Sequence, residues 1–173
     1  MVDIDKFVDM PITRVVAAWM VEEKWEDEIN ISDDRKAATI STRFKINDQP
    51  HNLYFEIDEE SKYFSIFLYS PMSVPPARMT EMARILNRIN MRLALGRLAC
   101  HDDSDSNAVQ FLARIDVEGT MLVTRQIHSM LGAALNTMRR YGELLAATAL
   151  TKQSAETLWA SLLEDEALQQ AKK

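Results

Sequence analysis

The sequence predicts an α+β fold in which an antiparallel sheet packs on helices. Two apolar periodicities alternate along the 173 residues, one with a period of three to four positions and one with a period of two. The first is typical of amphipathic helices and the second of half-buried strands. No regular strand–helix–strand alternation appears, so a doubly wound parallel sheet is disfavoured. The expected order is α-β-β-β(-β)-α-β-β-α, followed by a C-terminal helix.

The first helix is expected over residues 11–24, because its apolar residues share one helical face and proline is tolerated in a first turn. That face consists of Ile12, Val15, Val16, Trp19 and Met20. Ahead of the helix, Ile4, Phe7 and Val8 are expected to form a short amphipathic arm.

Three strands, with a fourth at the edge, are expected between residues 25 and 69. The clearest is "KAATISTRFKI" (36–46), where apolar and polar side chains alternate. The turn cluster "NDQP" (47–50) separates it from "NLYFEI", and "DEESK" separates that segment from "YFSIFLY". "WEDEINI" (25–31) reads as a further, acidic edge strand. "SPMSVPP" (70–76) is expected to end this run of strands.

The second half of the chain is expected to hold a helix, a hairpin and a long helical end. Residues 77–90 carry a second apolar helical stripe, and "MRLALGRLAC" and "AVQFLARIDV" alternate on either side of the polar turn "HDDSDSN". Thr124 is the expected N-cap of the next helix. A break is expected near residues 151–153, where Thr148 and Thr151 weaken the helix; one long bent helix is the alternative.

The helical end divides the chain into a single α+β domain (1–149) and an amphipathic extension (150–173). In the extension, Leu158, Trp159 and Leu162 share one face with Ala155. If this stripe is not packed on its own domain, it is a candidate site for a partner protein. The alternative is that the extension covers the sheet or pairs with a dimer mate.

Composition limits the partners and the compartment. The net charge of −6 disfavours nucleic acid, and no run of 18 apolar residues exists, so no membrane span is expected. The single cysteine, Cys100, cannot form an internal disulfide. These features are typical of a cytoplasmic protein in a reducing compartment.

No catalytic, cofactor-binding or metal-binding residues can be assigned. The three histidines (His51, His101 and His128) are scattered, without zinc-ligand spacing. Asp103, Asp105 and Asn107 copy the first positions of a calcium loop, but its glycine and its last glutamate are replaced by Ala108 and Arg114. Cys100 and His101 are adjacent in an expected strand, so their side chains diverge. The acidic runs 58–60 and 164–166 are interpreted as solvated.

Two asparagines, Asn87 and Asn90, stand three positions apart at the end of the second helix. Asparagine tolerates the left-handed conformation that ends helices, which suits Asn90. Asn87 borders the apolar stripe, and a partly buried amide there needs hydrogen-bond partners. The pair is therefore interpreted as a structural latch between helix and strand rather than a ligand site.

This N-x-x-N motif lies in "MTEMARILNRINMRLALGRLACHDDSDSNAVQFLARIDVEG" (79–119), which resembles the YbjN-domain family of bacteria, described as putative sensory transduction regulators. "LVTRQIHSMLGAALNTMRRYGELL" is similar to the closing helix of that family. The resemblance covers roughly residues 11–145. It implies a type III secretion chaperone-like fold, whose members are typically small, acidic and dimeric, and whose secretion chaperones bind extended partner segments.

The expected function is therefore a non-enzymatic protein-binding module, chaperone-like or regulatory. It is expected to act as a homodimer in bacterial stress or signalling regulation, on a protein or peptide partner. The alternative is a small-molecule sensor or an uncatalogued enzyme that uses a cleft between helices and sheet.

Overall fold

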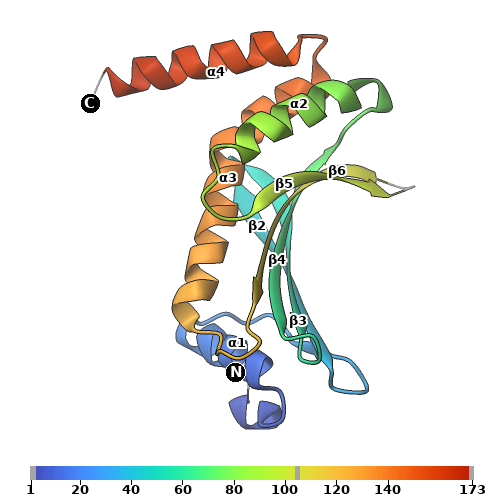
Figure 1. Ribbon diagram of the computed structural model, residues 1–173, viewed down its shortest axis with the longest axis vertical. Helices are drawn as coiled ribbons and strands as arrows, with labels where there is room; N and C mark the ends of the chain where they lie inside the picture. The colour runs from blue at the N-terminus through green and yellow to red at the C-terminus, as the bar shows by residue number, and fades with distance from the viewer. Residues whose placement is uncertain (1–2, 104–105, 172–173) are drawn as a thin grey trace.

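The computed structural model describes residues 3–103 and 106–171 and confirms the predicted α+β class. Six antiparallel strands form one sheet in the order β1-β2-β3-β4-β6-β5, and helices α1 and α3 lie along one of its faces (Figure 1). The strands are β1 (Asn30–Ile31), β2 (Ala37–Ile46), β3 (Gln49–Asp58), β4 (Tyr63–Ser73), β5 (Arg97–Asp103) and β6 (Ser106–Asp116). The α-helices are α1 (Pro11–Glu22), α2 (Met79–Asn90), α3 (Thr124–Leu150) and α4 (Ala155–Gln170).

The hydrophobic core lies between the sheet and the helices α1 and α3. Every second residue of the central strands points into it and is almost fully buried: Leu53, Phe55 and Ile57 from β3, and Phe64, Ile66 and Leu68 from β4. An aromatic cluster closes the core beside α1, where the ring centroid of Trp19 lies 4.8 Å from that of Trp25 and 5.7 Å from that of Phe55. The apolar faces that the period-two and period-3.6 patterns predicted for strands and helices thus pack against each other in one layer.

The hairpin between β2 and β3 has a two-residue turn. Asn47 and Asp48 have φ angles of 48° and 61°, the left-handed conformation that both central residues of a type I′ turn require. Gln49 and Pro50 belong to β3, where they pair with Ile46 and Lys45. The predicted turn over residues 47–50 was therefore two residues too long.

The N-terminus of α1 is capped by a carboxylate from a distant turn. Glu59 is only 6% exposed, and its Oε1 accepts hydrogen bonds from the backbone N and the Oγ1 of Thr13, at 2.7 and 2.9 Å. Its Oε2 accepts from the backbone N of Ile12 at 3.3 Å. The first amides of a helix lack partners inside the helix and favour a negative charge. The interpretation of residues 58–60 as a solvated run was thus wrong for Glu59.

Two expected strand segments are mostly irregular. In residues 25–31 only Asn30 and Ile31 pair with β2, because Trp25 turns inward and packs in the aromatic cluster. In residues 91–100 the strand begins only at Arg97, after a loop in which Gly96 takes a φ of +75°. The alternation of Leu93 and Leu95 therefore did not indicate a strand.

One strand is longer than expected, since β4 continues through Pro71 to Ser73. Pairing with β3 ends at Tyr69, so the missing N–H of the proline costs no bond on that side. On the other side, the register with β6 shifts between Tyr69 and Ser73.

The ends of the long helix follow the sequence closely. Helix α3 begins at Thr124, with Val123 as its N-cap residue, one position before the one expected. The side chain of Gln126 accepts a hydrogen bond from the backbone N of Val123 at 2.9 Å. The chain leaves the helix at Thr151 and resumes at Ala155, so the predicted break is confirmed and one long bent helix is excluded. In the described part of the chain, no helix has both the length and the apolar character that a membrane crossing requires.

Candidate functional site

The apolar stripe of the C-terminal extension is packed on its own chain. Helix α4 lies across α2 and the end of α3 (Figure 1), and Leu158 is 7% exposed. Trp159 and Leu162 are half-buried. The indole of Trp159 lies under the guanidinium groups of Arg88 and Arg92, at 6.0 and 4.9 Å from the ring centroid. The stripe is therefore not a free apolar patch in this structure.

Polar contacts hold both ends of α4 in place. At its start, Glu81 accepts a hydrogen bond from the backbone N of Ala155 at 2.5 Å. Farther along, Glu166 pairs with Arg140 at 2.7 Å and with Arg92 at 3.1 Å. The hydrogen bond from Arg140, followed by the one from Arg92, lowers the pKa of Glu166. These contacts fix the helix to the domain by charge as well as by packing.

The two asparagines have different environments. Asn90 donates from Nδ2 to the carbonyl of Leu98 at 2.9 Å and accepts at Oδ1 from its backbone N at 2.7 Å. The side chain thus ties the end of α2 to the start of β5. Asn87 is exposed, so the expected partly buried amide at this position was wrong, because the residue faces away from the core stripe.

The sheet has an open edge along most of β2. β1 pairs only with Ala38 and Thr39, whereas β2 continues to Ile46. The rest of this edge, from Ile40 onward, has no neighbouring strand among the described residues. A free strand edge presents backbone donors and acceptors to any extended chain that approaches it.

The register shows which residues of β2 face this edge with their backbone. The two-residue turn is closed by Ile46 and Gln49, which form a hydrogen-bonded pair. The next pair, Lys45 with Pro50, is a non-hydrogen-bonded pair, and this suits proline because it has no N–H. Hydrogen-bonded and non-hydrogen-bonded pairs alternate in an antiparallel ladder. The N–H and C=O groups of Ser41 and Arg43 therefore point away from β3, toward the open edge.

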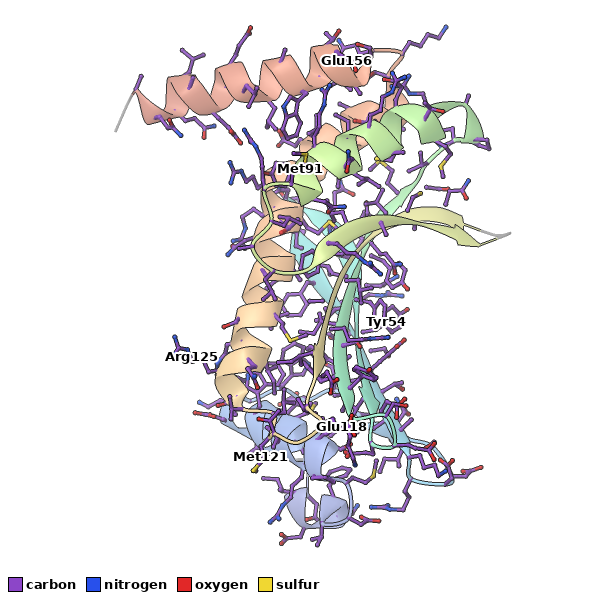
Figure 2. All side chains as sticks on the ribbon, viewed as in Figure 1. Tyr54, Met91, Glu118, Met121, Arg125 and Glu156 are labelled. Atoms are coloured by element: carbon purple, nitrogen blue, oxygen red, sulfur yellow. The ribbon has the colours of Figure 1, made fainter. Side chains whose placement is uncertain are left out.

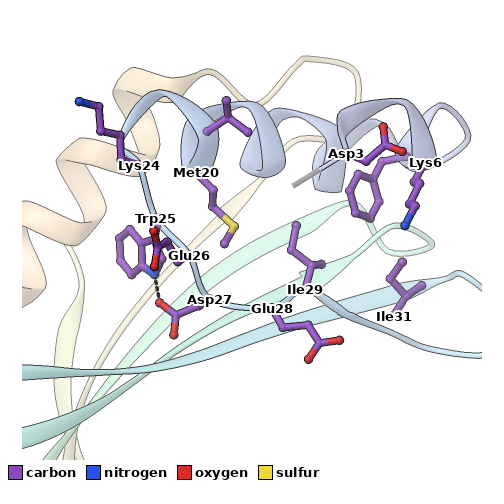
Figure 3. Close-up of a pocket in the computed structure, with 12 residues that line it drawn as sticks. Asp3, Lys6, Met20, Lys24, Trp25, Glu26, Asp27, Glu28, Ile29 and Ile31 are labelled. Carbon is purple, nitrogen blue, oxygen red and sulfur yellow. Dashed lines mark hydrogen bonds between the residues drawn. The ribbon is translucent and has the colours of Figure 1, made fainter. Parts of the chain in front are cut away.

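A cavity of about 960 Å³ lies next to the start of this edge, between α1, the N-terminal arm and the segment that leads into β1. Phe7 and Met20 are buried and line its apolar side. Met20 lies on α1, and Ile29 and Ile31 lie on the segment across from it (Figure 3). Four acidic residues line it together with Lys6 and Lys24, so the charges of its lining are negative on balance. Asp27 accepts a hydrogen bond from the indole of Trp25. The cavity suits an apolar side chain, with a positive charge near its rim.

The arm that helps to line this cavity is a 3₁₀-helix, Ile4–Phe7. Phe7 is buried, whereas Val8 is 67% exposed, so the expected amphipathic arm buries only part of its apolar side. Arg35 holds the arm to the sheet, since its guanidinium donates to the carboxylate of Asp9 at 2.6 and 2.7 Å.

A second cavity, of about 440 Å³, lies between α3 and the ends of the strands β2, β3 and β4. Its lining is mostly apolar, with residues such as Ile46, Met72 and Met138. His51 also lines it and is 5% exposed. Burial lowers the pKa of His51, against a smaller raising effect from its hydrogen bond with the carbonyl of Gln49 at 3.0 Å.

Metal and thiol chemistry find little support in the described residues. Among them, no group of three or more His, Cys, Asp or Glu side chains is placed to hold a metal ion. Of the calcium-loop candidates, Asp105 and the side chain of Asp103 lie outside the described residues. Cys100 is half-buried, with its Sγ 3.8 Å from the Sδ of Met79.

Comparison with known proteins places the chain in a family. The family model named YbjN, "Putative bacterial sensory transduction regulator", matches residues 14–147. The crystal structure of YbjN from E. coli, described as a putative transcription regulator, superposes with a TM-score of 0.51 at 9% identity. That alignment covers 74% of this chain and 89% of the other.

A second similar structure is that of the ExsC–ExsE complex. The TM-score is 0.54 at 14% identity, over 78% of this chain and 92% of the other. No curated protein matches the sequence. At these identities the structures support the fold alone, whereas the family model covers most of the chain. This protein is therefore a member of the YbjN family.

Proposed function

We propose that this protein is a non-enzymatic protein-binding module, chaperone-like or regulatory, that recognises an extended segment of a partner protein. The observation that carries the proposal is the open edge of β2 beside a cavity with an apolar floor. The similarity of the fold to that of ExsC, solved in complex with ExsE, supports it.

Recognition would proceed by addition of a strand to the sheet. A partner segment that pairs with Ser41 and Arg43 would continue the ladder that β1 begins at Thr39. Main-chain hydrogen bonds would supply affinity, and an apolar side chain in the cavity would supply specificity. The acidic residues around the cavity favour a basic neighbour in the partner segment.

The proposal includes three features that rest on the family resemblance and the sequence. The active form is a homodimer, it acts in the bacterial cytoplasm, and its role lies in stress or signalling regulation. Residues 1–149 form the binding domain and residues 150–173 form its extension. Sedimentation equilibrium of the full chain tests the dimer, because a monomer at micromolar concentration would contradict it.

The partner is first identified by affinity capture from the bacterium, and overlapping peptides of the captured protein supply an extended fragment for binding. Ser41→Pro then tests the edge, because proline removes the backbone N–H of residue 41 that points outward. Ser41→Pro should abolish binding of the fragment, while Ser41→Ala should retain it. Hydrogen exchange should show protection of the β2 amides on binding. If circular dichroism shows that both variants are folded and they bind the fragment equally, strand addition is ruled out.

A second candidate function, a small-molecule sensor, is supported by the cavity between α3 and the sheet. Its apolar lining and buried His51 are typical of ligand pockets. A metabolite at about 100 times its Kd should stabilise the fold by about 2.7 kcal/mol in a thermal-shift assay. Gly142 lines this cavity, and a Cβ there meets no atom within 4 Å. Gly142→Leu should therefore fill the space and abolish the shift, and a screen without any shift would count against a sensor.

A further inference from the structure

The strand β4 is apolar on both of its faces. Phe64, Ile66 and Leu68 point into the core and are fully buried. The residues between and beyond them point to the other face, and these include Phe67 and Tyr69, which are only half-buried. A strand with this pattern is normally covered on both sides. Here, however, α1 and α3 lie along the inner face (Figure 1). Met79 of α2 contacts Cys100, which points to the same side of β5 as the buried Leu98.

The outward residues of neighbouring strands extend this surface into an apolar patch, here called the outer patch. Phe67 lies directly opposite Tyr54 of β3 and Leu112 of β6. The ring of Tyr69 packs edge-on against that of Tyr54, with 5.6 Å between the centroids. Tyr54 is 37% exposed, and it points away from the side on which Arg125 of α3 lies (Figure 2).

Arginines flank the outer patch on both sides. Arg97 of β5 lies opposite Leu112, and Arg43 of β2 lies opposite Asn52, which in turn pairs with Tyr69. Both arginines are exposed, and within the described residues neither forms an ion pair. The net charge of the chain is −6, so two exposed cations without an ion pair among the described residues, one on either side of an apolar centre, favour an anionic partner.

The spacing of these arginines defines the length of a matching segment. The strands β3, β4 and β6 separate β2 from β5, and neighbouring strands lie about 4.8 Å apart. Arg97 shares a row with Ser41, two residues along β2 from Arg43, so the two arginine backbones are separated by about 20 Å. An extended chain that crosses the strands advances about 3.3 Å per residue, and covers this span in about six residues.

We propose that the outer patch is a docking surface for an extended protein segment in which acidic residues about six positions apart flank an apolar centre. A second copy of this chain fits less well, because it would bring the same arginines to the interface and like charges repel. Nucleic acid also fits less well, since two arginines neutralise few phosphates on an acidic protein. The outer patch is separate from the cavity at the β2 edge and goes beyond the function proposed above.

The test uses a fluorescein-labelled nonapeptide with two glutamates at each end and the centre Ser-Leu-Phe-Leu-Ser. Its binding to the full chain is measured by fluorescence anisotropy in about 50 mM salt, where exposed charges are weakly screened. The matched control peptide carries glutamine in place of each glutamate. The glutamate peptide should bind about tenfold more tightly than the control, and the difference should shrink in about 300 mM salt.

Variants of the protein locate the binding. Arg43→Gln and Arg97→Gln should each raise the Kd of the glutamate peptide about three- to fivefold, the range expected for loss of an exposed ion pair. Tyr54→Ser removes an exposed ring without touching the core, and should weaken both peptides equally. Arg125→Gln removes an exposed charge from the opposite side of the molecule, so it should change nothing.

Several results would overturn the proposal. These are equal affinity for the two peptides, unchanged affinity in the variant with both Arg43→Gln and Arg97→Gln, and no binding at about 1 mM protein. A dimer that Tyr54→Ser dissociates would identify a second copy as the occupant instead, and Arg43-dependent binding of oligouridylate would identify nucleic acid. Arg97 lies on β5, at the opposite edge of the sheet from β2, so Arg97→Gln should weaken binding of the glutamate peptide and leave binding of the partner fragment at the β2 edge unchanged. Failure at the β2 edge and failure at the outer patch are therefore distinguishable.

Discussion

Replacing Gly96 with alanine should destabilise the protein more than any other glycine-to-alanine change at a left-handed position. Gly96 has a φ of +75°, and a Cβ there would lie 2.2 Å from Cζ of Phe111 and 2.9 Å from the carbonyl oxygen of Leu112. Phe111 is fully buried, and the carbonyl belongs to β6. Neither atom can move without a shift of the sheet or the core.

The expected cost has two parts. A left-handed residue with a Cβ costs about 1 kcal/mol relative to glycine. Overpacking against the buried ring and the strand adds about 1–3 kcal/mol. The sum is about 2–4 kcal/mol of unfolding free energy, which lowers the Tm of a domain of this size by roughly 5–15 °C.

Gly119 provides the matched control. Its φ is +71°, but a Cβ there meets nothing within 4 Å, so Gly119→Ala should cost only the backbone part, about 1 kcal/mol. Urea denaturation followed by circular dichroism measures both variants. Phe111→Leu combined with Gly96→Ala should cost less than the sum of the single changes, because the smaller side chain relieves the overlap. Equal destabilisation at Gly96 and Gly119 would refute the steric argument.

Three further predictions concern polar contacts. Glu59→Ala should cost about 3 kcal/mol in urea denaturation, since it leaves buried amides of a helix N-terminus without an acceptor, whereas its exposed neighbour Glu60→Ala should cost under about 1 kcal/mol. Asn90→Ala should cost about 1–3 kcal/mol through two lost backbone contacts, and Asn87→Ala should be close to neutral; a reversed order would restore the partly buried role expected for Asn87. Arg140 and Arg92 lower the pKa of Glu166 below its ordinary value of 4.5. The contribution of these ion pairs to stability is therefore fully present above pH 4.5 and is lost as the pH falls through the lowered pKa. Glu166→Gln should therefore speed hydrogen exchange in α4 at pH 7, with a difference from the unmodified protein that vanishes in acid; a difference that persists there would contradict the ion pair.

Local periodicity was sufficient to predict most of the fold. In β3 it predicted which side chains enter the core, because burial on one face imposes a period of two. It misassigned the loop at Leu93 and Leu95, since two alternating leucines can pack from a loop as well as from a strand. It also missed the role of Glu59, whose partners lie 46 residues away and leave no trace in the neighbouring sequence.

The candidate sites were harder to predict than the fold. The stripe of Leu158 and Trp159 was correctly identified as apolar, but its position depends on tertiary contacts with α2 that no local pattern encodes. The outer patch did leave a signal, because "YFSIFLY" is apolar at both parities. That signal becomes informative only when the helices are known to cover one face.

The cap on α1 also has a consequence for the order of folding. A helix of 12 residues is marginal on its own in water, and the carboxylate of Glu59 reaches its first amides only when the turn between β3 and β4 has formed. The strands β2, β3 and β4 are joined by short turns and pair with their neighbours in sequence, so this meander is expected to form first and α1 to dock late. By the same reasoning α1 is expected to detach early in unfolding. Because Met20 of α1 lines the cavity at the sheet edge, the shape of the cavity that a partner would meet depends on how firmly α1 is docked.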